Sequence, residues 1–509
     1  MIKDKYIILL IILFLFAFSI RIYFFNSVTT EQWQDAYWMM RVSENLFSGK
    51  GYTLWGKPHN IFQPGYPVTF GLLSLILNNS HLSGKIVSFL SSLLIIPIIY
   101  LLWKELESKE IALLTTFLVI IQPLVWEFSL RIMTESLFLL LMVSSFFFLF
   151  KSKENIKYLP LVSIILAYSC LTRWEGYLLT LSCIITFLYW KRKIIFGKGY
   201  ATLNWEKITP YLKNKYIVLS FLLFIIPVGT WWLRNLFETG SLIPSYYQRK
   251  AGEGNPSIGL FWFSVLSNAL TLPVFLISIL GLIISFKKWE NHLPFYLFFI
   301  LYSALHMYFF RSYERFAIIP MPLLFGWFSL AVFYFLKERQ KYLKYLILIL
   351  IISLTSYYGF LIAPNNIIEH GKRYDVIKES MNWFNENTSP EDKLLAGDSA
   401  VYGFYTNREV FRYDVPNYYL SLSLQKNPQL SQNPYVVHLI FMIQNNITYF
   451  VPYDSLMPHF YNPTKIFADN FTTHKISFKD GTLILNPVNK FEENNQSIYL
   501  YKVLWNPKI

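Results

Sequence analysis

Long apolar runs dominate the first two thirds of the chain and predict a series of membrane-spanning helices. A helix needs about 20 predominantly apolar residues to cross the hydrocarbon core of a bilayer. Runs of suitable length lie at about 5–25, 86–103, 110–126, 135–150, 157–172, 176–190, 216–233, 258–285, 293–310, 316–336 and 342–362. The pattern therefore predicts a polytopic α-helical membrane protein with about eleven transmembrane helices.

Two apolar segments call for a separate interpretation. Tyr66 to Leu77 provides only about a dozen apolar residues before Asn78, which favours a re-entrant or interfacial helix. The first run, 5–25, is too long for a cleaved signal peptide and too poor in small residues at its end. We interpret it as a retained helix.

The composition changes after Ala363. Residues 364–509 are rich in Asn, Asp, Lys and Tyr. The run KISFKDGTLILN alternates like two strands around an Asp480-Gly481 turn, and VVHLIFMIQNN followed by ITYFV reads as a helix leading into a strand. The sequence thus predicts a transmembrane domain at 1–363, with a first outer loop at 26–65, and a C-terminal soluble α/β domain at 364–509.

The distribution of basic residues predicts the orientation. If the N-terminus is cytoplasmic and Tyr66–Leu77 does not cross, 20 Lys and Arg residues lie inside and 11 lie outside. This bias agrees with the positive-inside rule and places the C-terminal domain on the outer side. The net charge of +14 therefore reflects membrane topology and does not indicate a nucleic-acid partner.

Arginine is concentrated on the outer side, at 7 of 11 basic residues, against 2 of 20 inside. The planar guanidinium suits phosphate and carboxylate, so this pattern favours an anionic ligand on the outer face. The alternative is that these arginines snorkel at helix ends. His306, in an aromatic run, is interpreted as a core residue.

Asp35 is the candidate general base. The spacing of apolar residues from Asp35 to Asn45 predicts a short amphipathic helix on the membrane surface, with Met39 and Val42 on its apolar face and Gly49 and Gly51 at its end. A carboxylate at its start can accept a proton from a hydroxyl group. It can equally cap the helix.

This first loop resembles that of the GT-C class of integral-membrane glycosyltransferases, which includes polyprenyl-phosphate mannosyl-, arabinosyl- and aminoarabinosyltransferases. The resemblance rests on Asp-Ala-Tyr at 35–37 followed by Arg41, Asn45 and a Gly-x-Gly. Similar motifs follow in the same order: FQPGYP at 62–67, SLRIMTESLF at 129–138, LTRWEGY at 171–177, RNLFETGSLIP at 234–244 and YERF with PMP at 313–322.

The chain departs from the class at two places. Gln34 precedes Asp35 where many members have a second acid. Leu233 follows Trp231-Trp232, so the Trp-Trp-Asp signature of oligosaccharyltransferases is missing, which argues against en bloc transfer of an oligosaccharide.

The resemblance implies an inverting glycosyltransferase that moves one sugar from a polyprenyl-phosphate donor to an acceptor hydroxyl on the outer face. Asp35 is then the base. The substrate-binding candidates are Arg234 and Arg315, then Arg311 and Arg173, for the phosphate, Tyr37 and Glu135 for the sugar, and Arg41. No cofactor is expected. No metal is required, because an activated phosphate leaving group needs no protonation and a single carboxylate base suffices. The sequence also has no His/Asp/Glu cluster at ligand spacing.

The acceptor can be a glycan, a lipid or a protein. Two other functions stay open: a transporter or flippase for lipid-linked sugars, and a non-catalytic scaffold that presents the outer domain to envelope proteins. The frequent Lys, Ile and Asn favour an AT-rich prokaryotic genome and hence the plasma membrane.

Overall fold

The computed structural model describes residues 5–27, 34–54, 56–192, 209, 211, 213–242, 259–308, 314–335, 375–397, 399–412, 435–451, 471–478, 480–493 and 496–508. The chain divides into two compact units. Unit 1 comprises Met1–Asn26 and Val42–Asn365, and unit 2 comprises Ser27–Arg41 and Asn366–Ile509.

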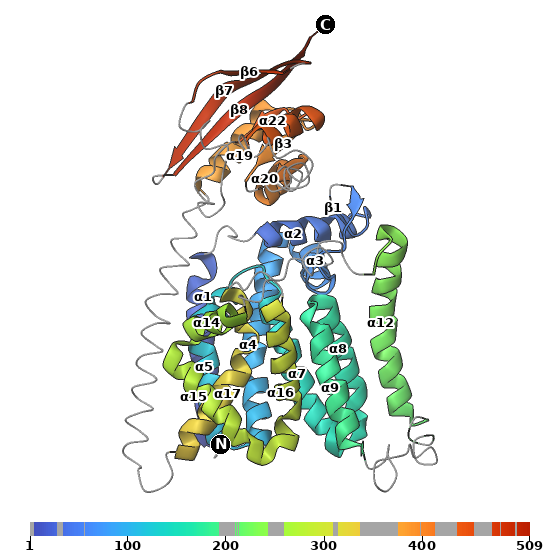
Figure 1. The fold of residues 1–509 in the computed structure, drawn as a ribbon. Helices are drawn as coiled ribbons and strands as arrows, with labels where there is room; N and C mark the ends of the chain where they lie inside the picture. Colours follow the sequence, from blue (N-terminus) through green and yellow to red (C-terminus); the bar gives the residue numbers. More distant parts are fainter. Residues whose placement is uncertain are drawn as a thin grey trace. The chain divides into compact units, whose positions relative to one another are not determined.

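Unit 1 is a bundle of apolar helices (Figure 1). They are α1 Lys5–Phe24, α3 Gly65–Leu77, α4 Ser80–Leu106, α5 Lys109–Ile121, α6 Pro123–Phe128, α7 Glu135–Glu154, α8 Leu159–Thr172, α9 Glu175–Trp190, α12 Lys215–Thr239, α14 Gly259–Leu270, α15 Leu272–Ser285, α16 Trp289–Tyr308 and α17 Met321–Phe335. Helix α7 packs on α4 and α8, α8 also packs on α12, and α15 packs on α17.

Five helical segments in the described part of the chain are long and apolar enough to cross a membrane. They are α1, α4, α7, α12 and the stretch 272–307. A polytopic helical membrane protein is therefore confirmed. The number eleven stays a prediction, and the expected span 342–362 lies outside the described residues.

Two predicted spans are divided in the structure. The run 258–285 was expected to be one helix, but it breaks at Thr271, whose φ is 68°, and α15 restarts with Pro273 in its first turn. The run 110–126 breaks at Gln122, whose side chain accepts a hydrogen bond from the Leu124 N–H at 2.9 Å and caps α6. Hydropathy misses both breaks because the halves on either side are equally apolar.

The helix predicted at the start of the first loop is confirmed as α2, Gln34–Phe47. It ends where the pattern predicted, because Gly49 and Gly51 have φ values of 82° and 75° that favour glycine. Its first residues, through Arg41, belong to unit 2, and Val42 onward belongs to unit 1. Met39 and Val42 are buried. A short hairpin of β1 Thr53–Leu54 and β2 Lys57–Pro58 follows.

Unit 2 is built on a six-stranded mixed sheet in the order β4-β3-β5-β8-β7-β6. Its elements are α19 Asp375–Asn387, β3 Leu394–Ala396, α20 Ser399–Thr406, β4 Val410–Arg412, α22 Tyr435–Gln444, β5 Tyr449–Phe450, β6 His474–Phe478, β7 Gly481–Glu493 and β8 Gln496–Pro507. Strand β3 runs parallel to β4 and β5, and the three C-terminal strands are antiparallel.

The local predictions for this region are confirmed. Helix α22 leads into β5, and β6 pairs with β7 across the turn at Asp480-Gly481. Leu395, Leu439, Met442 and Phe450 form the centre of the core and are fully buried. In β7, Leu483 and Leu485 are buried and Ile484 between them is half-buried, which is the alternation typical of a strand with one face on the core.

Candidate active site

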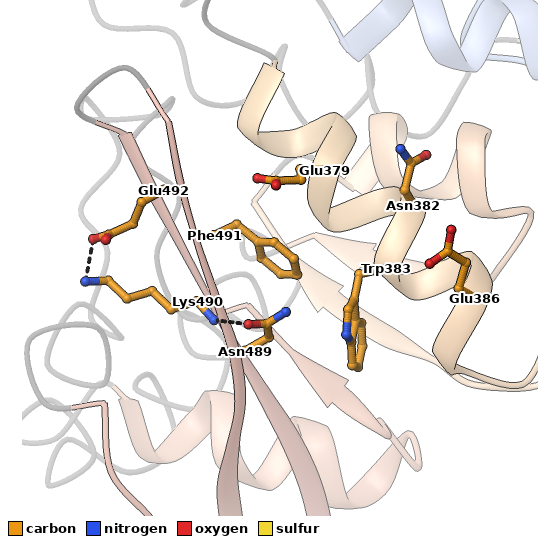
Figure 2. Close-up of a pocket in the computed structure, with 8 residues that line it drawn as sticks. All are labelled: Glu379, Asn382, Trp383, Glu386, Asn489, Lys490, Phe491 and Glu492. Atoms are coloured by element: carbon orange, nitrogen blue, oxygen red, sulfur yellow. Dashed lines mark hydrogen bonds and ion pairs between the residues drawn. The ribbon is translucent and has the colours of Figure 1, made fainter.

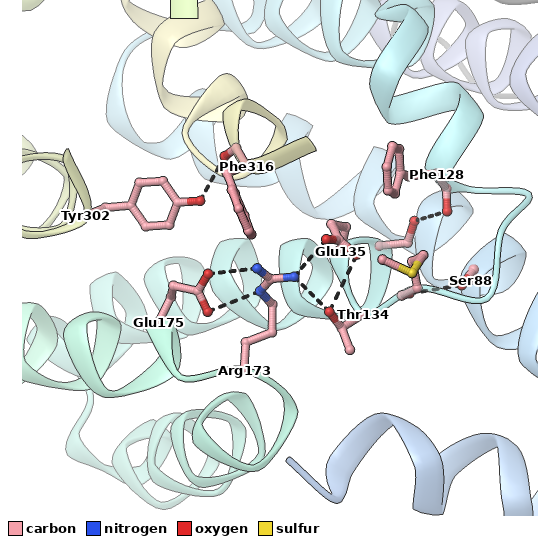
Figure 3. A network of polar contacts seen from close by, with 10 residues as sticks. Ser88, Phe128, Thr134, Glu135, Arg173, Glu175, Tyr302 and Phe316 are labelled. Carbon is pink, nitrogen blue, oxygen red and sulfur yellow. Dashed lines mark hydrogen bonds and ion pairs between the residues drawn. The ribbon is translucent and has the colours of Figure 1, made fainter. Parts of the chain in front are cut away.

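A largely buried arginine in unit 1 is the centre of a polar cluster (Figure 3). Arg173 Nη2 lies 2.7 Å from Glu175 Oε1, and its Nε donates to Glu175 Oε2 at 3.2 Å. Its Nη1 donates to Glu135 Oε1 and to Thr134 Oγ1, both at 2.8 Å. The cluster thus joins three polar segments that are separate in sequence: the start of α7, the end of α8 and the start of α9.

The helix ends place these three charges. Glu135 is the first residue of α7, Glu175 is the first residue of α9, and Arg173 is the C-cap of α8. A carboxylate is stabilised by the partial positive charge at a helix N-terminus. Each acid therefore sits in a favourable position even before Arg173 binds it.

Two motif glycines allow the chain to approach the end of α8. A Cβ at Gly176 would lie 2.4 Å from the Ser169 carbonyl oxygen, and one at Gly65 would lie 2.6 Å from Thr172 Oγ1. Both distances are too short for any real side chain. The motifs FQPGYP and LTRWEGY therefore meet at one place in the structure.

Aromatic rings flank the cluster. The Tyr302 hydroxyl donates to the Phe316 carbonyl oxygen at 2.8 Å. His306 stacks on Trp262 with ring centroids 4.6 Å apart and lies 4.4 Å from the Tyr302 ring. These contacts agree with the interpretation of His306 as a buried residue among aromatics, and its exposed fraction is 5%.

Arg315 reaches the same aromatic group. Its guanidinium carbon lies 5.1 Å from the centroid of Phe316, and that of Arg173 lies 5.7 Å from the same ring. Two guanidinium groups and two carboxylates, from Glu135 and Glu175, thus surround this corner of unit 1. Burial acts to lower the pKa of Arg173, but Glu175 and Glu135 outweigh it and raise that pKa well above its usual value.

Glu135 lies four residues after Arg131, but the structure pairs it with Arg173 instead. Arg131 binds Glu127, with its Nη2 and Nε each 2.9 Å from Glu127 Oε1. The sequence alone does not tell whether Arg131 pairs with Glu127 or with Glu135, because each acid lies four residues from it.

Arg234 contacts a different part of unit 1. Its Nη1 donates to the His59 carbonyl at 2.7 Å and to Asn235 Oδ1 at 3.0 Å, and its Nη2 donates to the Tyr52 carbonyl at 2.8 Å. These bonds tie the β1–β2 hairpin to the end of α12. Three of the five N–H donors of an arginine are therefore engaged by the protein, which supports a structural role for Arg234.

Asp35, Tyr37 and Arg41 belong to unit 2. Asp35 lies half-buried in the first turn of α2. Tyr37 is fully buried against the rings of Phe404 and Tyr405, with centroids 5.8 and 5.7 Å away. Arg41 Nη2 donates to the Phe404 carbonyl at 2.6 Å, so both side chains hold α2 against α20.

Several members of the Arg173 cluster were not among the predicted site residues. Glu175, Thr134 and Tyr302 were missed, although Glu175 stands only two residues after Arg173. Arg311 lies outside the described residues. In the described part of the chain, no group of three or more His, Cys, Asp or Glu side chains is arranged to hold a metal ion.

Comparison with known proteins gives both a family-model match and a fold. The model of the family "Dolichyl-phosphate-mannose-protein mannosyltransferase" matches residues 58–231. This range contains Gly65, Glu135, Arg173 and Glu175. No curated protein matches the chain.

Solved structures of two membrane glycosyltransferases are similar to the chain. The apo oligosaccharyltransferase of Archaeoglobus fulgidus has a TM-score of 0.61 at 13% identity, over 90% of this chain and 70% of that one. ArnT from Cupriavidus metallidurans, bound to undecaprenyl phosphate, has a TM-score of 0.61 at 9% identity, over 98% of both chains. A third structure, AglB from Archaeoglobus fulgidus with an inhibitory peptide and a dolichol-phosphate, has a TM-score of 0.55 at 14% identity, over 88% of this chain and 69% of that one.

Proposed function

From the GT-C glycosyltransferase fold of this chain, we propose that it is an inverting glycosyltransferase. It moves a single sugar from a polyprenyl-phosphate donor to a hydroxyl group of a glycan, lipid or protein acceptor. The reaction takes place on the outer face of the plasma membrane of a prokaryote, with the N-terminus in the cytoplasm. The proposal extends to this chain the lipid phosphates bound by the similar structures: undecaprenyl phosphate in ArnT and dolichol-phosphate in AglB.

The proposed chemical step is a single displacement. The acceptor oxygen attacks the anomeric carbon, and the bond from that carbon to the phosphate oxygen breaks with its electron pair on the phosphate. The proton of the acceptor hydroxyl passes to the carboxylate of Asp35. The transition state has oxocarbenium character, as in other glycosyl transfers, and the polyprenyl phosphate departs without needing a proton.

The observation that carries the proposal is the Arg173 cluster, within the stretch that matches the mannosyltransferase family model. Glu135 and Glu175 are two buried carboxylates with fixed directions, and fixed carboxylates can bind sugar hydroxyls. Arg173 is a positioning residue that holds both acids. Arg315, over the Phe316 ring, is the proposed ligand of the departing phosphate, where a preorganised cation stabilises the developing charge. Arg311 stays a second candidate for the phosphate.

The contacts of the other candidates support roles in holding the first loop. Arg234 fixes the β1–β2 hairpin that follows α2. Tyr37 and Arg41 fix the beginning of α2, which carries Asp35.

Asp35→Asn is the decisive substitution. The amide has almost the size of the carboxylate but cannot take the proton, so we expect the rate of sugar transfer to fall by about 10²- to 10⁴-fold. The purified protein in lipid nanodiscs is given polyprenyl-phosphate sugars, and released polyprenyl phosphate is measured by mass spectrometry.

The matched control is Glu44→Gln, which changes another acid of the same helix. Glu44 accepts a hydrogen bond from Ser80 and is not assigned to the reaction. Full activity of Asp35→Asn would remove the base from the mechanism. If the unmodified protein consumes no donor of any sugar class, the transporter and scaffold functions replace the transferase.

A further inference from the structure

A cleft of about 590 Å³ lies in unit 2, between α19 and β7 (Figure 2). Helix α19 contributes Glu379, Asn382, Trp383 and Glu386. Their spacing of i, i+3, i+4 and i+7 places all four on one face of the helix. The residues from β7 are Asn489, Lys490, Phe491 and Glu492.

On α19, the residues that line the cleft lie on a different face of the helix from the residues that face the core. On α19, Ile377, Met381 and Phe384 are buried at exposed fractions of 0%, 4% and 1%, and they face the interior. Trp383 is only half-buried. On β7, the pairing with β8 shifts between Pro487 and Asn489, and such a bulge re-aims the side chains that follow it.

The aromatic part of the cleft is formed by the half-buried Trp383 and by Phe491, which is buried beside it. Their ring centroids are 6.5 Å apart with an angle of 65° between the planes. Figure 2 shows both rings between the helix and the strand, with Asn382, Glu386 and Asn489 around them. An aromatic surface surrounded by hydrogen-bonding groups suits a ligand that has an apolar C–H face and hydroxyl groups at its edge.

The charge of the cleft disfavours acidic ligands. Its lining has three carboxylates, from Glu379, Glu386 and Glu492, and one ammonium group, from Lys490, which gives a formal charge of −2 (1 − 3). Lys490 is itself paired with Glu492. A phosphate, sulfate or uronic acid would therefore meet like charge, whereas carboxylate and amide oxygens accept hydrogen bonds from hydroxyl and amino groups.

We propose that this cleft binds a sugar unit of a glycan that has no acidic groups, either neutral or amino-substituted. That this glycan is the acceptor of the reaction rests on the proposed transferase function. That the cleft binds sugar does not depend on it. The cleft would hold a part of the acceptor that does not react.

The test is saturation-transfer NMR on the full chain in lipid nanodiscs, because maltoside detergents carry sugar headgroups of their own. The probes are mannotriose, chitotriose, the glucosamine trimer and trigalacturonic acid. We expect saturation of at least one of the first three trimers and none of the acidic trimer. Trp383→Ala should weaken binding about tenfold or more, through loss of the aromatic surface.

Because Trp383 also contacts Tyr449, a second variant tests the site without touching the core. Glu386→Gln changes an exposed residue of the lining and should weaken binding of the glucosamine trimer most. The control, Lys378→Ala, lies on the same helix, is exposed and does not line the cleft. It should leave binding unchanged.

Three results would overturn the proposal: no trimer binds, binding survives both cleft variants, or trilysine binds and no sugar does, which would indicate a basic peptide as the ligand. Release of polyprenyl phosphate is measured on the same samples. If a trimer binds but no donor is consumed, the proposed transferase function is wrong and the proposed sugar site stands. If donor is consumed but no trimer binds, only the proposed sugar site is wrong.

Discussion

At the scale of single residues, Arg173 is the most constrained side chain of the candidate site. Its partners Glu135 and Glu175 have side-chain exposed fractions of 1% and 9%, and its own is 10%. Removing one partner of a buried ion pair leaves an uncompensated charge, at a cost of about 3–5 kcal/mol.

Arg173→Met is therefore expected to lower the unfolding temperature of unit 1 strongly, since two acids lose their common partner. The triple variant Arg173→Met, Glu135→Gln, Glu175→Gln removes all three charges and should recover most of that loss, while transfer activity stays low. Thermal unfolding in detergent and the donor-release assay measure the two effects separately. Equal melting temperatures for the single and triple variants would contradict an ion-pair role.

His59 provides a pH-dependent contribution to stability. It is 6% exposed, and its Nε2 accepts a hydrogen bond from the Phe62 N–H at 3.3 Å. Burial and the nearby charge of Arg234 lower its pKa to about 4. The unfolded chain, with an ordinary histidine pKa of about 6.5, binds a proton first as the pH falls.

The contribution of His59 to the free energy of unfolding should therefore be fully present above pH 6.5. It should decline between about pH 6.5 and 4, by up to about 3 kcal/mol. His59→Gln, which cannot titrate, should show a flatter profile over that interval. Melting temperatures recorded from pH 7.5 to 4.5 compare the two proteins. Parallel profiles would show that His59 is not the titrating group.

At the scale of elements, the end of α8 is the point where several segments meet. Helix α3 approaches it at Gly65, the first turn of α9 approaches it at Gly176, and Arg173 caps it. The spacing between these segments is set by backbone contact, so a single methyl group has no space.

Gly176→Ala should accordingly destabilise unit 1 by about 1–3 kcal/mol or more, since overpacking must push the α8–α9 turn apart. The control is Gly229→Ala on α12, where a Cβ meets nothing within 4 Å. There, alanine should stabilise the helix by about 0.5–1 kcal/mol. Similar melting temperatures for the two variants would contradict the close approach.

Many of the helices could be predicted from the sequence, but the contacts between them could not. Hydropathy predicted α1, α4, α7 and the short α3, because lipid requires a continuous apolar run for each span. It could not predict the pairing of Arg173 with Glu135, which lie 38 residues apart and meet only when α7 packs on α8. Nor could it reveal that Thr271 interrupts an apolar segment.

At the scale of the whole molecule, the chain combines two compact units of different composition. The sheet of unit 2 follows from strand alternation and turn residues, which are local signals. The inclusion of Ser27–Arg41 in that unit does not follow from local signals. It depends on contacts of Tyr37 and Arg41 with α20, more than 360 residues away in the sequence.

Arg408 tests whether the units unfold separately. It is 5% exposed, and its donors reach the Phe384, Thr388 and Ser389 carbonyls at 3.1, 2.8 and 3.0 Å, in the last turn of α19 and just after it. Arg408→Ala leaves these acceptors without their partner, at about 3 kcal/mol or more. It should lower one calorimetric transition and leave a second in place.

The control for Arg408 is Lys393→Ala. Lys393 forms an exposed ion pair with Glu409 at 3.2 Å, and such pairs contribute less than about 1 kcal/mol. Loss of both transitions together in Arg408→Ala would indicate that the chain unfolds as one body.

The hydrogen bonds around Arg173 have a consequence for which ligands can bind there. Four of its N–H donors are already taken by Glu135, Glu175 and Thr134, whereas each carboxylate can accept about four hydrogen bonds. The cluster therefore has acceptors to spare and few donors. A ligand group that donates a hydrogen bond, such as a sugar hydroxyl, meets several remaining acceptors, whereas an anion meets only the one remaining N–H donor of Arg173. A deoxy sugar that lacks the contacting hydroxyl should thus be a poorer substrate. A fluorine at the same position should not restore activity, because fluorine cannot donate a hydrogen bond.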